Sequence, residues 1–357
     1  MRPLSATECI TPAIERTKSL LFRPFQWRPF LKLTAVAFFA EIGSGFSGSS
    51  GRHGHHLPGV SPAAAALIVA ILIGIFFVAL IIGLVMFYVS SRLQLVTFHF
   101  VATRQTTIAP IWRRYSSLTW RWLGLKLLFF LAFILVLIAA LGPVIFSMVK
   151  RMPSGGAPPT AAFFSHIALF LGMAFLVVIV IGAAYVLLRD LALPFLALED
   201  LHITAALSRL RSLIAAEPGE VALYILFRFL LGLVAAIGAE ILIGLTLIVS
   251  LIPFALIGGV LWLALRHAGL VGTAALVASA IIGGLVLLFW MACVTIGVVG
   301  TLFVFTQAYA LYFLGGRYPL LGNILEPVPF LPYTPPPPLP VQPGEDGPPL
   351  PADPSPA

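Results

Sequence analysis

Residues 62–90 read PAAAALIVAILIGIFFVALIIGLVMFYVS, and none of these 29 residues carries a charge. An α-helix rises 1.5 Å per residue, so about 20 apolar residues cross the hydrocarbon core of a bilayer. The stretch exceeds this length and offers water almost no polar side chain. It therefore predicts a transmembrane helix, and with it an integral membrane protein.

Further apolar runs on both sides of this stretch predict further spans. Of the 357 residues 60% are hydrophobic and 10% are charged. A soluble domain is about 45–50% apolar and about 25% charged, so lipid must solvate most of this chain. We expect an all-α, polytopic bundle of about six transmembrane helices, at residues 29–46, 62–90, 122–149, 162–188, 221–250 and 271–314.

Two stretches have alternative interpretations. Residues 29–40 follow a basic segment and could belong to a cleaved signal peptide, but the basic segment is long for that and we favour an uncleaved helix. Residues 253–265 are short for a span, and Pro253 would kink a continuous helix. They form either a bent extension of the fifth helix or a re-entrant segment.

Basic residues alternate along the chain in a way that predicts its orientation. The segments before the first, third and fifth spans are rich in Arg and Lys, whereas the first and last intervening loops hold only Arg52 and Arg266. Basic loops face the cytoplasm, so we expect both termini there and the chain in a cell membrane. The net charge of +8 is spread over these flanking segments, without the basic domain that nucleic-acid binding needs.

Three basic segments also resemble one another. Each has an Arg two residues after an Ile or Leu and a Ser three residues after the Arg, and two apolar runs follow it. The segments are residues 11–19, 108–116 and 204–212, with Arg16, Arg113 and Arg209 at 97- and 96-residue intervals. We interpret them as helices in the headgroup plane, with Arg facing anionic lipid, each opening one of three parallel repeats.

This repeat gives the expected domain organisation. A six-span membrane domain covers residues 1–316, with repeats at about 8–104, 105–201 and 202–316. Residues 317–357 are Pro-rich and should form a disordered cytoplasmic tail, because they hold too few apolar residues to fold.

The third segment carries a family resemblance. Residues 194–200 (PFLALED) and 205–210 (AALSRL), together with 21–25 (LFRPF), resemble the membrane domain of bacterial membrane-anchored glycerophosphodiester phosphodiesterases and related multi-pass bacterial proteins of unknown function. The resemblance covers residues 5–316 and implies a location in the bacterial inner membrane. Those phosphodiesterases also have a catalytic barrel, a fold of about 250 residues. Only residues 317–357 follow the last predicted span here, so no hydrolase activity is expected.

Charged residues inside apolar runs are the candidate functional residues. Glu41 lies in the first predicted span, and Glu240 and Arg228 lie in the fifth. A carboxylate in hydrocarbon costs at least a few kcal/mol unless it is paired, protonated or hydrated. Glu240 and Glu41 could form a proton- or cation-linked site or could be structural, whereas we expect Arg228 to extend toward the headgroups.

The sequence contains no convincing catalytic or metal-binding constellation. Residues 45–48 (GFSG) match the GxSG of rhomboid-type proteases, but a composition rich in Gly and Ser explains the match, and only His166 offers a base. Residues 52–56 (RHGHH) lack carboxylate or thiolate neighbours, and Cys9 and Cys293 have no metal-ligand spacing. We expect no cofactor and no metal.

These observations favour a non-enzymatic membrane module that acts in envelope, lipid or partner organisation. The expected partners are the lipid bilayer and other membrane proteins, and the oligomeric state is not predicted. The alternative is a transporter or channel with a membrane-embedded carboxylate site at Glu240.

Overall fold

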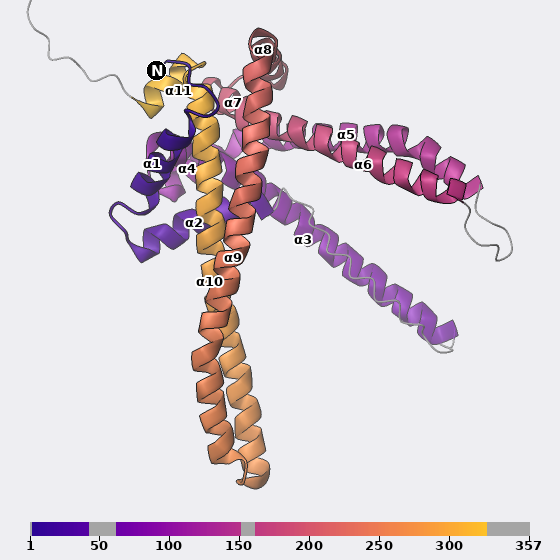
Figure 1. Cartoon of the computed structure of the whole chain (residues 1–357), viewed down its shortest axis with the longest axis vertical. Coiled ribbons are helices and arrows are strands. Elements are labelled where there is room, and N and C mark those ends of the chain that lie inside the picture. Colours follow the sequence, from indigo (N-terminus) through magenta and orange to yellow (C-terminus); the bar gives the residue numbers. More distant parts are fainter. Residues whose placement is uncertain (1, 43–61, 151–160, 327–357) are drawn as a thin grey trace, which may run out of the picture. The chain divides into compact units, whose positions relative to one another are not determined.

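The structure is a computed structural model that describes residues 2–42, 62–150 and 161–326. Every regular element in these ranges is helical, which confirms the all-α prediction (Figure 1). The elements are α1 (Ile10–Leu21), α2 (Trp27–Ile42), α3 (Pro62–Thr103), α4 (Ile108–Arg114), α5 (Ser116–Lys150), α6 (Ala161–Leu187), the π-helix η1 (Leu188–Ala192), α7 (Leu193–Glu199), α8 (Ile203–Ala216), α9 (Pro218–Leu265), α10 (Gly269–Gly315) and α11 (Pro319–Leu325).

Five helical stretches are long and apolar enough to cross a bilayer. They make the chain a multi-pass membrane protein, as predicted. The stretches are Leu67–Thr103, Ser116–Ser147, Ile167–Glu199, Pro218–Leu265 and Gly269–Gly315.

The first predicted span, 29–46, is not among these five. Its counterpart α2 has 16 residues, fewer than the roughly 20 that a crossing needs, and its last turn contains Glu41. Residues 43–46 lie outside the described residues. The prediction of about six spans is therefore corrected to five helices of sufficient length in the described part of the chain.

The ambiguous stretch 253–265 proves to be part of α9. This helix runs without interruption through Pro253 for 48 residues, so the re-entrant interpretation is wrong. At 1.5 Å per residue α9 is about 72 Å long and must extend beyond a bilayer. It packs along α10, as α5 packs along α6 (Figure 1).

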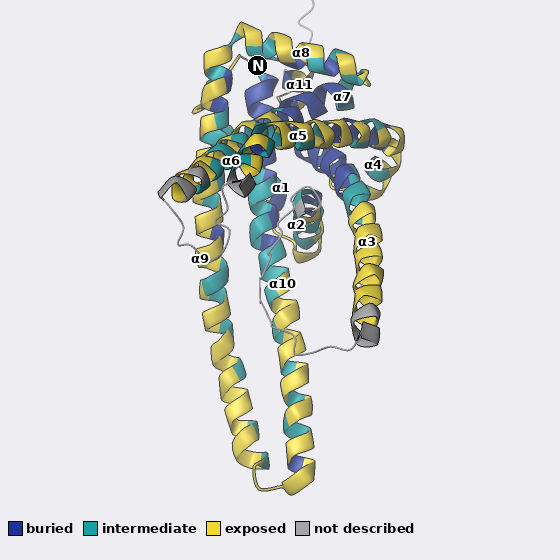
Figure 2. Ribbon diagram, turned by 90° about the vertical axis from the view of Figure 1, so that its right-hand side faces the viewer, coloured by how far each residue is buried: buried dark blue, intermediate teal, exposed yellow. Residues whose placement is uncertain are grey.

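A buried core forms where the C-terminal ends of α3 and α10 and the N-terminal ends of α5 and α9 meet short helices. It contains the end of α3 after Tyr88, η1 with α7, and the end of α10, packed with α1, α4 and α11. Trp122, Tyr224 and Tyr309 are among its largest fully buried side chains. Figure 2 shows these buried ends in dark blue, whereas the rest of the long helices is exposed and apolar. Such exposure suits a lipid solvent.

Three shorter helices coincide with the predicted interfacial segments. α1, α4 and α8 cover most of residues 11–19, 108–116 and 204–212, and each precedes two further helices. The threefold repeat itself stays a prediction. The expected tail begins with a helix instead, because α11 packs its Leu321 and Leu325 into the core.

Candidate functional site

Five charged side chains gather where the exposed apolar helices give way to the core. They come from α2, α5, η1 and α9, and we call them the buried charge cluster. Its members are Glu41, Lys126, Arg189, Asp190 and Arg228. At the same level α3 and α6 change from exposed to buried side chains.

Asp190 is the centre of this cluster. Its Oδ1 accepts a hydrogen bond from Arg189 Nε at 2.9 Å, and its Oδ2 accepts one from Arg228 Nε at 3.0 Å. The hydroxyl of Tyr224 donates to the same Oδ2 at 2.8 Å. The carboxylate is fully buried, and both oxygens are engaged by protein donors. This arrangement offsets the cost of removing the charges from water.

The π-helix η1 positions the two central residues. It spans Leu188–Ala192, and all five of its residues are buried. A single π turn within an α-helix widens the backbone locally, and such turns are frequent at functional sites. Asp190 contacts α9 from this turn, while Arg189 Nη1 donates to Glu41 Oε2 of α2 at 2.5 Å. The cluster thus joins segments that are 148 residues apart in sequence.

Polar side chains of α3 hold the end of α2 beside the cluster. Ser90 Oγ and Gln94 Nε2 both donate to the carbonyl of Ala40, at 2.6 and 3.0 Å. These bonds join α2 to α3 at a buried position. Trp122 Nε1 of α5 donates to Gln94 Oε1 at 3.0 Å and fixes the amide in turn.

Lys126 adds a third cation to the cluster. Its Nζ donates to Ser91 Oγ at 3.2 Å and lies 5.6 Å from the ring centroid of Phe87 and 5.4 Å from that of Trp122. The residue is 3% exposed. Lys126 takes part in none of the salt bridges found among the described residues. Its ammonium group is stabilised by the two aromatic rings and by the hydroxyl of Ser91.

The structure brings two of the three membrane-embedded candidates together. Glu41 and Arg228 both belong to the cluster, bridged by Arg189 and Asp190. We predicted that Arg228 extends toward the headgroups, but its side chain binds the buried carboxylate of Asp190. Glu240 is exposed on α9, and within the described ranges it takes part in none of the ion pairs or hydrogen bonds found.

The three arginines of the predicted repeat differ in their surroundings. Arg16 is 3% exposed and donates to the carbonyls of Val101 (3.0 Å) and Ala102, so it caps the C-terminus of α3. Arg113 is exposed on α4, and Arg209 pairs with Glu199 at 2.5 Å. The prediction that Arg16 faces lipid is wrong, because its helix face, with Ala13 and Thr17, packs into the core.

A second ionic network, missed in the sequence, ties the start of the chain to α9 and α10. Arg317 Nε donates to Glu217 Oε2 at 2.7 Å, and its Nη1 donates to the carbonyls of Leu4 and Phe313, both at 3.0 Å. The guanidinium also lies 4.1 Å from the Phe313 ring centroid. Such a buried, multiply bonded arginine braces the core.

Both networks consist of charged groups that bind partners within the chain. In the described ranges no group of three His, Cys, Asp or Glu side chains could hold a metal ion. Residues 45–48 and 52–56 lie outside those ranges. Asp190 has both oxygens bound by donors of its own chain, an arrangement that holds helices in place.

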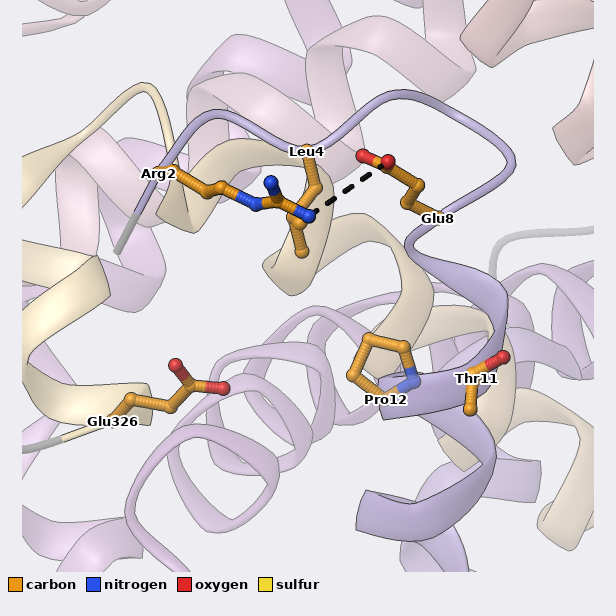
Figure 3. Close-up of a pocket in the computed structure, with 6 residues that line it drawn as sticks. All are labelled: Arg2, Leu4, Glu8, Thr11, Pro12 and Glu326. Atoms are coloured by element: carbon orange, nitrogen blue, oxygen red, sulfur yellow. Dashed lines mark ion pairs between the residues drawn. The ribbon is translucent and has the colours of Figure 1, made fainter.

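A polar hollow of about 460 Å³ lies near the start of the chain (Figure 3). Its lining includes Arg2, Glu8 and Glu326. Arg2 and Glu8 are 3.9 Å apart, with side chains 80% and 52% exposed. A solvated pair of this kind contributes little free energy, so we assign the hollow no site.

The core also predicts how the thiol of Cys9 behaves. Burial raises the pKa of Cys9 to about 12; the Arg317 charge opposes this rise, and Glu8 and Glu220 add to it. Because the folded pKa is raised, the neutral thiol's contribution to stability is present below about pH 9 and is lost as the pH rises toward 12. In a Cys293→Ser chain, a maleimide at pH 9 should label Cys9 only after denaturation. Rapid labelling of the folded chain would contradict this.

With the fold and the cluster described, the chain can be compared with known proteins. The model of the family described as "Family of unknown function (DUF7544)" matches residues 4–324. The chain belongs to the DUF7544 family. The match runs from before α1 into α11, and thus includes every member of the cluster.

The remaining comparisons add no further relative to this DUF7544 protein. No curated protein matches the chain. No solved structure matches it either. The chain is thus a protein of a family of unknown function with five long apolar helices, and no link to glycerophosphodiester phosphodiesterases is shown.

Proposed function

We propose that this DUF7544 protein is a non-enzymatic membrane module that organises lipids or partner proteins in a cell membrane. The buried charge cluster carries this proposal. Its acids and arginines pair with one another, at distances of 2.5–3.0 Å, across α2, η1 and α9. Charges paired in this way lock helices together, whereas a transport pathway needs ionisable groups that face a hydrated cavity.

The long helices supply the surface on which such a module would act. Apolar side chains of α3, α5, α6, α9 and α10 are exposed along most of their length. These faces can contact lipid tails or the helices of a partner. We further propose the orientation with both termini in the cytoplasm and a plan of three parallel repeats, supported by the basic segments and by the positions of α1, α4 and α8.

A transporter or channel is the second candidate, and Glu240 is the observation in its favour. This carboxyl group is exposed near the middle of α9, one of the five candidate spans. A charged acid at the centre of a bilayer costs roughly 2.5–3.5 kcal/mol or more, so a transport pathway at that depth would require Glu240 to be protonated, hydrated or paired with another molecule.

Flux measurements separate the two candidates. Vesicles containing the wild-type chain and a proton-sensitive dye should leak protons no faster than protein-free vesicles. Glu240→Gln should give the same rate, because the module has no conduction path through this residue. Glu15→Gln, which removes an exposed carboxylate on α1, is the matched control. Wild-type flux that Glu240→Gln abolishes and Glu15→Gln preserves would refute the module.

A further inference from the structure

An apolar groove of about 370 Å³ lies between the start of α2 and the pair α9 and α10. Phe22, Trp27 and Phe30 line one side, and Trp290 and Gly297 of α10 line the other. A Cβ atom at Gly297 would sit 3.4 Å from the ring of Phe30, so α2 and α10 approach each other closely at this point. Its shape and chemistry suit a hydrocarbon chain.

Unpaired cations flank this groove. Residues 22–32 read FRPFQWRPFLK and contain no acid. Arg23, Arg28 and Lys32 are exposed, and none of them takes part in the ion pairs or hydrogen bonds found between described residues. Arg23 follows Phe22 and Arg28 follows Trp27, so two cations adjoin groove-lining rings. The segment that lines this side of the groove therefore carries a net positive charge.

Aromatic rings place the same segment at a membrane–water interface. Phe22, Phe25, Trp27 and Phe30 pack against one another with centroid distances of 5.3–6.2 Å. Three of these side chains stay exposed, and Trp27 is 61% exposed. Amphipathic rings beside basic residues are typical of the headgroup level of a bilayer. A lipid at this level would present its phosphate to the cations and its tail to the groove.

We propose that this groove binds one phospholipid with a net negative headgroup. An acyl chain lies along Trp27 and Trp290, and Arg23 and Arg28 contact the phosphate and headgroup. Each basic residue near the surface adds about 1 kcal/mol of attraction to anionic lipid, or about five-fold in affinity. This site deepens the proposed function, on which it rests, by naming the lipid class and its place of binding.

Two tryptophans in the groove allow a direct test. Trp27 and Trp290 line it, and brominated acyl chains quench nearby indole fluorescence on contact. The chain is reconstituted in phosphatidylcholine vesicles that contain either brominated phosphatidylglycerol or brominated phosphatidylcholine. We expect phosphatidylglycerol to bind at least about five-fold more tightly. Equal quenching by the two lipids would overturn the proposal.

Variants test whether this preference for phosphatidylglycerol arises at the groove. Arg23→Gln with Arg28→Gln should bring the ratio of the affinities for phosphatidylglycerol and phosphatidylcholine close to one. The control, Arg104→Gln with Arg266→Gln, removes the same charge from exposed residues outside the groove and should preserve the preference. Trp27→Phe with Trp290→Phe should remove the excess quenching by phosphatidylglycerol. Excess quenching that persists in that variant would place the lipid elsewhere and overturn the site.

The flux experiment keeps the two proposals distinguishable. Equal quenching together with flux at the protein-free level removes the lipid site and leaves the membrane module standing. Flux that depends on Glu240 removes the module, whatever the lipids show.

Discussion

Replacing Asp190 by asparagine should lower the stability of the folded chain by about 3–5 kcal/mol. Asp190 is fully buried and engages Arg189, Arg228 and Tyr224 within 3.0 Å. Its neutralisation would leave three buried cations, Lys126 included, with Glu41 as the cluster's only anion. The loss of stability is measured by heating the detergent-purified chain to a series of temperatures. The fraction that still elutes as a monodisperse peak in size-exclusion chromatography is then followed.

A matched control shows whether burial causes this effect. Asp200→Asn removes the same charge from a pair with Arg121, at 2.8 Å, whose aspartate side chain is 78% exposed. Exposed pairs contribute at most about 1 kcal/mol. Similar losses for Asp190→Asn and Asp200→Asn would mean that the cluster is not desolvated in the native protein.

The long helices could be predicted because lipid imposes a simple length rule. Residues 62–90 and 271–314 both proved to be helical, within α3 and α10. The helix ends could not be predicted, because α3 continues to Thr103 inside a core formed by distant segments. In the predicted span 29–46, Ser90 and Gln94 of α3 bind the carbonyl of Ala40, a contact between distant segments that a length rule does not include.

The site was predictable in part, through the rarity of charge in apolar runs. That rule identified Glu41 and Arg228, and it should also have identified Lys126, which lies inside the predicted span 122–149. The pairing of these residues required the fold, because Glu41 meets Arg189 across 148 residues. We found no sequence signal for the π turn that directs Arg189 and Asp190 to different helices.

Arg16 shows why the amphipathic pattern misled. A basic residue on a short helix is typical of a headgroup contact, and Arg113 is indeed exposed. The end of α3 instead offers Arg16 two backbone carbonyls, Val101 and Ala102. A guanidinium with several donors satisfies such carbonyls well, and a sequence alone does not show which helix end lies nearby.

The second large effect concerns the contact between Glu41 and Arg189, which joins α2 to η1. Arg189→Met should cost several kcal/mol, because it removes the bonds that Arg189 makes to Glu41 and to one oxygen of the buried Asp190. Glu41→Gln should cost less, since Asp190 still balances Arg189. The two substitutions should not be additive, because each removes the same short ion pair.

A double-mutant cycle with Glu41→Gln and Arg189→Met is therefore the most direct measurement of whether the charges hold the helices together. Unfolding free energies of the wild type, both single variants and the double variant are compared in one detergent. We predict a coupling free energy of about 1–3 kcal/mol. A coupling of less than about 0.5 kcal/mol would contradict the account, because these residues would then not be bound to each other in the native protein.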